Sequence, residues 1–238
     1  MSGHSKWANI KHRKGAQDAK RSKVFQKLAT EIMVAIKEHG NDPETNARLR
    51  LAIEKAKAQN MPNSNIEKLL KEKSKSGGDW KELTYEGYGP KGAAILVSCL
   101  TDNTNRTSAT IQANFNKNGG NLGTGGSVSY LFERKGVIAI DKENISNLEE
   151  VMELALTADA LDIKEEESIL IIETAPIKLL ETKKAFEAAG IVKFISTEIS
   201  MIPITTIDLD ESSFTKLEKI IDALEDNDDV QAVYTNAV

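Results

Sequence analysis

Six segments between residues 135 and 202 alternate between the two hydrophobic periods of regular secondary structure, and their order restricts the fold more than any other feature. The runs GVIAI, ALDIK, SILIIET and VKFISTEISM have the composition of short strands. The segments SNLEEVMELALTA and IKLLETKKAFEAAG carry apolar residues three and four positions apart, as amphipathic helices do. The order strand, helix, strand, strand, helix, strand is that of a ferredoxin-like unit. We therefore predict a ferredoxin-like α+β domain at residues 135–202.

The segments on both sides of this unit predict a second sheet. Before it come the strand patterns ELTYEGY, AAILVSCL and VSYLF, with a helix from Asp102 to about Asn118 between the second and the third. After it come the strand ITTIDL, the helix ESSFTKLEKIIDALED and the strand VQAVYT, which are too few to stand alone. The simplest arrangement joins residues 80–134 and 203–238 in one discontinuous α+β domain, with the ferredoxin-like domain inserted in it.

Three short amphipathic segments precede the sheets and predict an N-terminal three-helix domain at residues 22–79. Their apolar residues recur at helical spacing, and candidate N-caps precede them at Ser22, Asp42 and Ser64. Residues 1–21 have no apolar period, so we expect a flexible arm there. The fold class is therefore α+β: a three-helix domain plus two α+β domains, one of them inserted in the other.

Composition and chain ends predict a cytoplasmic protein. The single cysteine, Cys99, lies in an apolar run typical of a buried strand, and one cysteine excludes an intrachain disulfide. The basic N-terminus lacks the apolar stretch of a signal peptide, and the longest apolar runs are too short to cross a bilayer.

The charge is distributed unevenly along the chain. The formal net charge is −5, but residues 1–75 carry +9 and residues 141–238 carry −15. A basic end favours polyanionic partners, and an acidic end repels them.

The N-terminal arm is the strongest candidate for binding a polyanion. Its cations can neutralise phosphates, and Trp7 can stack on an unpaired base. Extended, twenty residues reach roughly 70 Å. The alternative is a solubilising tail, which would not need an aromatic residue. The candidate residues in and beside the arm are Lys6, Trp7, Lys11, His12, Arg13, Lys14, Lys20, Arg21 and Lys23.

Two further groups could bind phosphates. The polar face of residues 44–60 carries Arg48, Arg50, Lys55 and Lys57. The stretch TDNTNRTS places Asn103 and Arg106 at a predicted helix start, where backbone N–H groups favour anions. Ordinary helix capping is the alternative for this second group.

The sequence contains no recognisable catalytic or metal-binding motif. The glycine-rich residues 119–127 lack the Gly-Lys-Ser/Thr ending of a phosphate-binding loop, and they follow a helix instead of preceding one. We interpret them as a mobile loop, with a contact to RNA or protein as the alternative. The histidines His4, His12 and His39 have no metal-ligand spacing. A hydrolase or transferase that uses the glycine-rich loop remains the competing class.

The chain resembles the YebC/PmpR family in six stretches that occur in the family's order and spacing: GHSKWANIKHRKGAQDAKR, YEGYGPKG, TDNTNRT, GGNLGTGGSVSYLF, EISMIP and LEDNDDVQAVYTN. The resemblance covers about residues 2–236. It implies a helical domain followed by two α+β domains, and no catalytic residues or cofactor. It also implies a non-enzymatic, nucleic-acid-binding regulator of gene expression.

The resemblance leaves the nucleic acid open. Some members of the family are described as binding promoter DNA and regulating transcription. Others are described as translation factors that help ribosomes through sequences such as proline runs, which would make ribosomal RNA, tRNA and the ribosome the partners. The sequence shows no helix with several base-reading side chains, so a basic arm fits structured RNA as well as DNA. Neither interpretation involves a membrane or a small-molecule substrate. A protein-interaction scaffold with an acidic surface is a third alternative.

Overall fold

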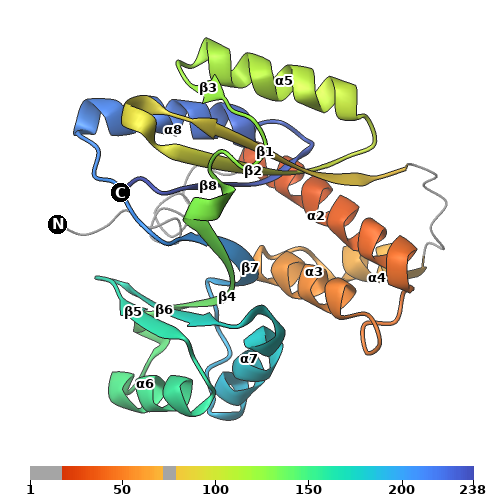
Figure 1. The fold of residues 1–238 in the computed structure, drawn as a ribbon. Helices are drawn as coiled ribbons and strands as arrows, with labels where there is room; N and C mark the ends of the chain where they lie inside the picture. The colour runs from red at the N-terminus through yellow and green to blue at the C-terminus, as the bar shows by residue number, and fades with distance from the viewer. Residues whose placement is uncertain (1–17, 72–78) are drawn as a thin grey trace. The chain divides into compact units, whose positions relative to one another are not determined.

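The computed structural model describes residues 18–71 and 79–238, with side chains from residue 21 onward (Figure 1). The chain contacts divide these residues into two compact units. The first contains the described residues up to Lys71 together with residues 134–200. The second contains residues 79–133 and 201–238.

The first part of the chain forms three helices that pack on one another. Their buried apolar residues form one cluster, in which Ile32, Leu49 and Ala56 have no exposed surface. Leu28, Ile53 and Ile66 pack around these residues. The helices are α2 (Asp18–His39), α3 (Ala47–Ala58) and α4 (Asn63–Lys71).

All three helices begin at other residues than the sequence predicts. In the described residues α2 extends back to Asp18, so the last four residues of the predicted arm are helical. Ala19, Lys20 and Arg21 are good helix formers without an apolar stripe, and hydrophobic periodicity detects only the packed part of a helix.

The second helix, α3, starts later than expected, and the third helix, α4, starts earlier. Asp42 caps the turn before α3, where its Oδ1 accepts from the N–H of Glu44, and Asn46 is the true N-cap. Ser64 lies inside α4, which begins directly after Pro62. Proline is favoured at helix starts because it lacks the N–H that would otherwise stay unpaired.

Asn46 fastens the start of α3 to the end of α2. Its side-chain Oδ1 accepts from the N–H of Leu49 at 3.0 Å, and its Nδ2 donates to the carbonyls of Ala35 and Gly40, both at 2.8 Å. The residue is 1% exposed. One amide therefore satisfies three backbone groups at a helix–helix junction, where unpaired groups would be costly.

The ferredoxin-like unit is confirmed. Its four strands form one sheet in the order β5-β6-β4-β7, and α6 and α7 lie on one face of it (Figure 1). Apolar side chains of the strands and of both helices form one buried cluster. The edge strand β5 and the central strand β4 both pair antiparallel with β6. The elements are β4 (Phe132–Asp141), α6 (Leu148–Thr157), β5 (Asp162–Glu165), β6 (Ile169–Thr174), α7 (Leu179–Ala188) and β7 (Ser196–Pro203).

The second sheet joins strands from both ends of the remaining chain. Its order is β3-β1-β2-β8, and the neighbouring strands are antiparallel. Helices α5 and α8 bury Phe115, Ile111 and Ile220 against β2, where Cys99 is the expected buried thiol. The elements are β1 (Lys81–Tyr88), β2 (Ala94–Thr101), α5 (Thr104–Lys117), β3 (Asn121–Leu122), α8 (Glu211–Glu225) and β8 (Val230–Thr235).

Short 3-10 turns connect several of these elements, and two predicted strands are absent as such. VSYLF is mostly a 3-10 turn that leads into β4. ITTIDL makes only one bridge, between Ile207 and Ala237, because its neighbour is the end of the chain after β8.

The exact domain boundaries remain a prediction. The 3-10 turns are η1 (Pro90–Gly92), η2 (Ser129–Leu131), η3 (Lys142–Asn144) and η4 (Pro176–Lys178).

We expect Asn46→Ala to lower the free energy of unfolding by about 2–4 kcal/mol, because it removes a helix cap and leaves two carbonyls without their donor. Urea unfolding followed by circular dichroism measures this. The matched control is Asn147→Ala, which removes an exposed cap of α6 and should cost about 1 kcal/mol. Equal losses in the two variants would show that Asn46 does not tie the helices together. Asn46→Asp keeps the cap acceptor without the donors and should resemble Asn46→Ala.

Candidate nucleic-acid interface

The residues predicted to bind nucleic acid fall into three groups, of which the arm is the largest. Most of the arm lies outside the described residues, namely Lys6, Trp7, Lys11, His12, Arg13 and Lys14. Lys20 belongs to α2, but its side chain is also outside the description. Their assignment therefore stays a prediction.

The arm's last cations lie on the first turns of α2. Arg21 and Lys23 are both exposed there. The Arg21 guanidinium carbon lies 5.4 Å from the centre of the Phe25 ring, a cation–π distance. A helix that starts at Asp18 carries these side chains at fixed spacing, so they continue the arm's positive charge onto a folded surface.

The cations of α3 are paired with carboxylates of the chain itself. Arg48 bonds Glu38 of α2 at 2.6 Å, and Lys55 bonds Glu31 of α2 at 2.9 Å. Lys57 lies 3.6 Å from Glu54 within α3. Partly exposed pairs of this kind are individually weak.

The α3 face is therefore less attractive to phosphate than its sequence suggests. A phosphate that reaches Arg48 or Lys55 competes with a carboxylate, which stays nearby and repels it. Leu51 of α3 also packs against the core of the ferredoxin-like unit, which narrows the polar face. The fourth predicted cation of this group, Arg50, has a buried Nε. This atom has no hydrogen-bond partner among residues 21–71 and 79–238.

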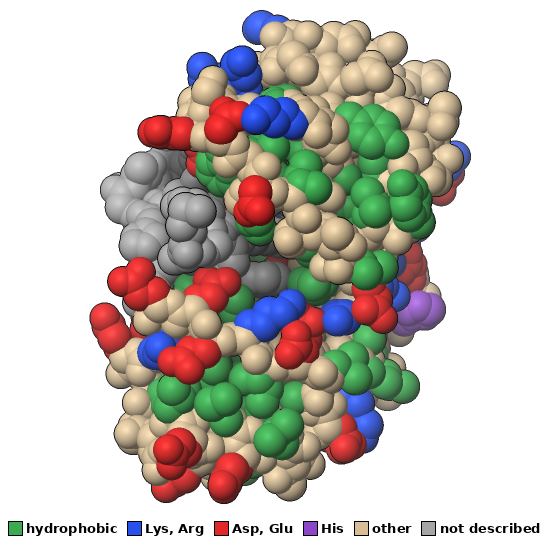
Figure 2. Space-filling model, turned by 60° about the vertical axis from the view of Figure 1, so that its left-hand side comes forward, with side chains coloured by type: hydrophobic (Ala, Val, Ile, Leu, Met, Phe, Trp, Pro, Cys, Tyr) green, Lys and Arg blue, Asp and Glu red, His purple; other side chains and the backbone are tan. Residues whose placement is uncertain are grey.

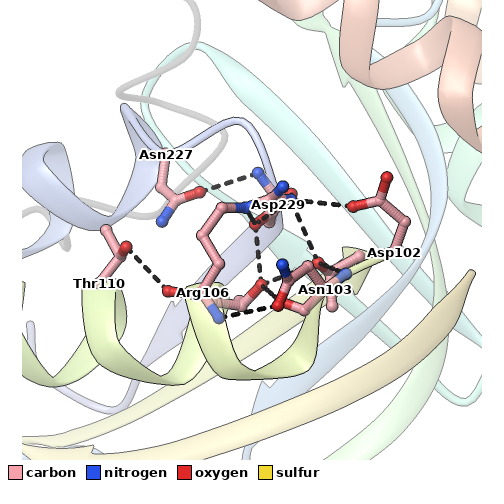
Figure 3. A network of polar contacts seen from close by, with 8 residues as sticks. Asp102, Asn103, Arg106, Thr110, Asn227 and Asp229 are labelled. Carbon is pink, nitrogen blue, oxygen red and sulfur yellow. Dashed lines mark hydrogen bonds and ion pairs between the residues drawn. The ribbon is translucent and has the colours of Figure 1, made fainter.

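The predicted site at the start of α5 is a closed ion-pair network (Figure 3). Asn103 is the N-cap, and its Oδ1 accepts from the N–H of Arg106 at 3.1 Å. The Arg106 guanidinium donates to both carboxylate oxygens of Asp229, at 2.8 and 3.1 Å through one nitrogen, and to Asp102 at 3.1 Å. Asp229 also accepts from the hydroxyl of Thr107 at 2.8 Å.

This network ties helix α5 to the loop before β8. Hydrogen bonding and charge from Asp229, and then from Asp102, raise the pKa of Arg106. The positive charge of Arg106 is therefore already paired with two carboxylates of the chain. In the structure Asn103 is the N-cap of α5, which is the alternative that the sequence analysis left open. Whether Asn103 and Arg106 also contact nucleic acid stays a prediction.

The glycine-rich loop is held by a buried carboxylate of β1. Glu86 is 7% exposed, and its oxygens accept from the backbone N–H groups of Gly126 at 2.8 Å, Val128 at 2.6 Å and Ser129 at 2.8 Å. Gly126 has φ +86°, a conformation that favours glycine. One amide of the loop and the two that follow it at Val128 and Ser129 thus surround an anion, but the anion is part of the chain.

Burial alone would raise the pKa of Glu86. The hydrogen bonds from Val128, Gly126 and Ser129 outweigh burial and lower the pKa below its ordinary value of 4.5. The carboxylate is therefore charged at neutral pH. It fills the space that a bound phosphate would need in a hydrolase or transferase of the competing class.

This finding also revises the interpretation of the loop as mobile. Beyond Glu86, the Tyr88 hydroxyl donates to the carbonyl of Ser127 at 2.8 Å. Gly87 of β1 lies so close to the loop that an added Cβ would stand 2.7 Å from the carbonyl oxygen of Asn121. The loop is packed and hydrogen-bonded along much of its length.

Sequence reasoning missed Glu86 and Asp229. Glu86 alternates with apolar residues in its strand and so reads as an ordinary exposed side chain, and Asp229 is 123 positions away from Arg106. No local pattern connects either residue with its partners.

The described residues contain neither a metal-binding cluster nor a membrane-spanning helix. Within residues 18–71 and 79–238, no three His, Cys, Asp or Glu side chains are grouped so that they could hold a metal ion. No helix in that part of the chain has the length and apolarity to cross a membrane.

Comparisons with known proteins cover nearly the whole chain. A family model described as the TACO1/YebC protein N-terminal domain matches residues 5–76, and one described as the TACO1/YebC second and third domain matches residues 80–237. The chain is 50% identical to the probable transcriptional regulatory protein YrbC of Bacillus subtilis, over 99% of both proteins. It is 49% identical to a probable transcriptional regulatory protein of Thermotoga maritima, over 99% of this chain and 93% of the relative.

A solved structure is also similar. The crystal structure of a conserved hypothetical protein from Aquifex aeolicus matches with a TM-score of 0.87 and 44% identity, over 98% of this chain and 97% of that one.

We expect Glu86→Gln to lower the free energy of unfolding by about 1–3 kcal/mol at pH 7, because an amide cannot accept from three N–H donors without turning its own N–H₂ toward one of them. Since the pKa of Glu86 is lower in the folded chain, its contribution is complete above about pH 5 and declines as the pH falls through that pKa. Urea unfolding at pH 7 and at pH 4 or below should therefore show a shrinking difference between wild type and variant. Glu82→Gln, an exposed carboxylate on the same strand, is the control. A difference that does not depend on pH would contradict this role.

Proposed function

Because the chain belongs to the TACO1/YebC family, we propose that it is a non-enzymatic regulator of gene expression that binds nucleic acid through its basic N-terminal region. The membership confirms the resemblance seen in the six sequence stretches. Its relatives in Bacillus subtilis and Thermotoga maritima are named probable transcriptional regulatory proteins, which supports a regulatory role.

The charge distribution carries the proposal. Residues 1–75 have a balance of +9 and residues 141–238 a balance of −15. Binding to phosphates releases counterions from the nucleic acid, and this supplies most of the affinity that does not depend on sequence. The acidic part is repelled by the same polyanion, so it orients the molecule with its basic end toward the ligand.

The ion pairs described above narrow the site within the basic region. Arg48, Lys55 and Lys57 have carboxylates of the chain beside them, and so does Arg106. We infer that the principal phosphate contacts come from Lys6 to Lys23, and that the α3 cations add a weaker, secondary surface. Trp7 supplies base stacking, and Arg21 and Lys23 join the arm to α2.

Two nucleic acids remain candidates. The names of the relatives favour DNA and regulation of transcription. Structured RNA, in a translation factor bound to the ribosome, is the second candidate. The balance of −15 in residues 141–238 supports it, because an acidic body resists wrapping along duplex DNA.

We expect log K for binding to a duplex DNA of random sequence to fall with log salt at a slope of about −5, if about six cations meet phosphates. Replacing Lys6, Lys11, Arg13 and Lys14 by Gln should flatten the slope by about 3–4, since each lost phosphate contact removes about 0.9. Fluorescence anisotropy at several salt concentrations gives both slopes.

The control for this experiment removes the same charge elsewhere. Lys117, Lys184, Lys193 and Lys216 are exposed lysines outside the basic region, and their replacement by Gln should leave the slope nearly unchanged. Equal slopes for the arm variant and the wild type would refute the arm as the binding site. Repeating the titrations with a folded RNA hairpin tests the second candidate. Tighter binding to the hairpin by about tenfold or more at equal salt would favour it.

Trp7→Ala tests stacking separately from charge. We expect it to weaken binding to single-stranded nucleic acid by about 1–3 kcal/mol and to leave the salt slope unchanged, because stacking releases no counterions. Trp7→Phe should retain much of the affinity, since a smaller aromatic face still stacks. A loss that appears in the slope, or a Phe variant as weak as the Ala variant, would argue against stacking.

A further inference from the structure

Four large apolar side chains lie exposed on the ferredoxin-like unit, and all of them except Val192 come from segments that contact one another. Leu156 at the end of α6 is 66% exposed, Leu161 just before β5 is 59% exposed, and Ile177 in η4 is 89% exposed. Single exposed apolar residues are common, but several together with a polar rim mark an interaction surface.

Printed contacts bring the three segments together at one end of the helical layer. The Thr182 hydroxyl of α7 donates to the carbonyl of Ala158, directly after α6, at 3.3 Å. Lys178 lies 3.9 Å from Asp159. The N–H of Leu161 donates to the carbonyl of Glu173 at 2.7 Å, four residues before Ile177. The end of α6, the start of β5 and the start of α7 therefore meet where the exposed apolar residues lie.

Carboxylates border this surface. Glu153 stands one helical turn before Leu156, Asp162 follows Leu161, and Glu181 stands one turn after Ile177. All three are exposed. Residues 141–174 contain eleven Asp and Glu but only two Lys. Figure 2 shows, over this unit at the bottom of the view, hydrophobic side chains with Asp and Glu side chains around them.

The few cations nearby do not offset this charge. Lys178 forms ion pairs with Asp159 and Glu181, the latter at 3.0 Å. Lys164 is bonded to the buried carboxylate of Glu173 and lies 3.7 Å from Asp162. The surroundings of the apolar side chains thus remain negative.

We propose that Leu156, Leu161 and Ile177 form a docking surface, the acidic-rimmed patch, for a basic amphipathic segment of a partner protein. The partner's apolar residues cover the three side chains, and its Lys and Arg residues meet Glu153, Asp162 and Glu181. Complementary charge of this kind steers association and selects the partner. Nucleic acid and anionic lipid surfaces are repelled by the same rim. The protein would then hold a polyanion at its N-terminal region and a basic protein at the ferredoxin-like unit.

A synthetic helical peptide of Leu and Lys, labelled with a fluorophore, serves as the probe for the full-length protein. We expect Leu156→Ser combined with Ile177→Ser to weaken binding by about tenfold or more, because both side chains lie at the centre of the contact. The matched control combines Val192→Ser and Ile204→Ser, which are 70% and 65% exposed but lie outside the patch, and should change affinity by less than about twofold. All four residues are exposed, so circular dichroism should show intact folds.

Amide chemical shifts measured with the unlabelled peptide locate the contact. We expect changes confined to residues near 153–162 and 174–181. The proposal is overturned if the two double variants bind the peptide equally, or if the shifts lie elsewhere. Equal binding of a Leu and Glu peptide would also overturn it, because charge would then play no part. Self-association of the wild type that the patch variant abolishes would overturn it too, because the occupant would then be a second copy.

Discussion

Carboxylates of the chain itself pair with cations and backbone amides that would otherwise be open to a phosphate. Glu38 and Glu31 pair with Arg48 and Lys55 on the helical surface. At the start of α5, both carboxylate oxygens of Asp229 accept hydrogen bonds from Arg106. Glu86 accepts from the backbone amides at the end of the glycine-rich loop, those of Gly126, Val128 and Ser129. Groups that look like anion-binding sites in the sequence therefore stabilise the fold. Their hydrogen-bond donors are already satisfied by carboxylates of the chain.

Buried polar side chains also connect segments that are far apart in the sequence. The Arg106–Asp229 pair joins α5 to the loop before β8, across 123 positions of sequence, and Asn236 accepts from the N–H of Ala94 across 142. These contacts between residues far apart in the sequence link β8 to a sheet whose first strands precede the ferredoxin-like segment. The polar bonds supply specificity of pairing, and the apolar cluster around Phe115 and Ile220 supplies the burial.

The proposed function and the proposed docking surface assign two tasks to separate parts of one chain. The basic N-terminal region has the charge for a polyanion, and the acidic ferredoxin-like unit has the charge and exposed apolar side chains for a basic protein. In such an arrangement, surfaces of opposite charge allow each site to reject the other site's partner.

Hydrophobic period and order of elements in the sequence were enough to predict the ferredoxin-like unit, the three helices and the α+β class, because these patterns report directly on which faces are buried. The charge imbalance likewise depends on composition alone. Helix starts such as Asp18 and Asn46 escaped prediction, since capping and propensity leave weaker traces than packing. Only the tertiary structure decided that Glu86 fills the glycine-rich loop, that Asp229 holds Arg106 and that ITTIDL makes a single bridge. Each of these depends on residues that are remote in sequence and adjacent only after folding.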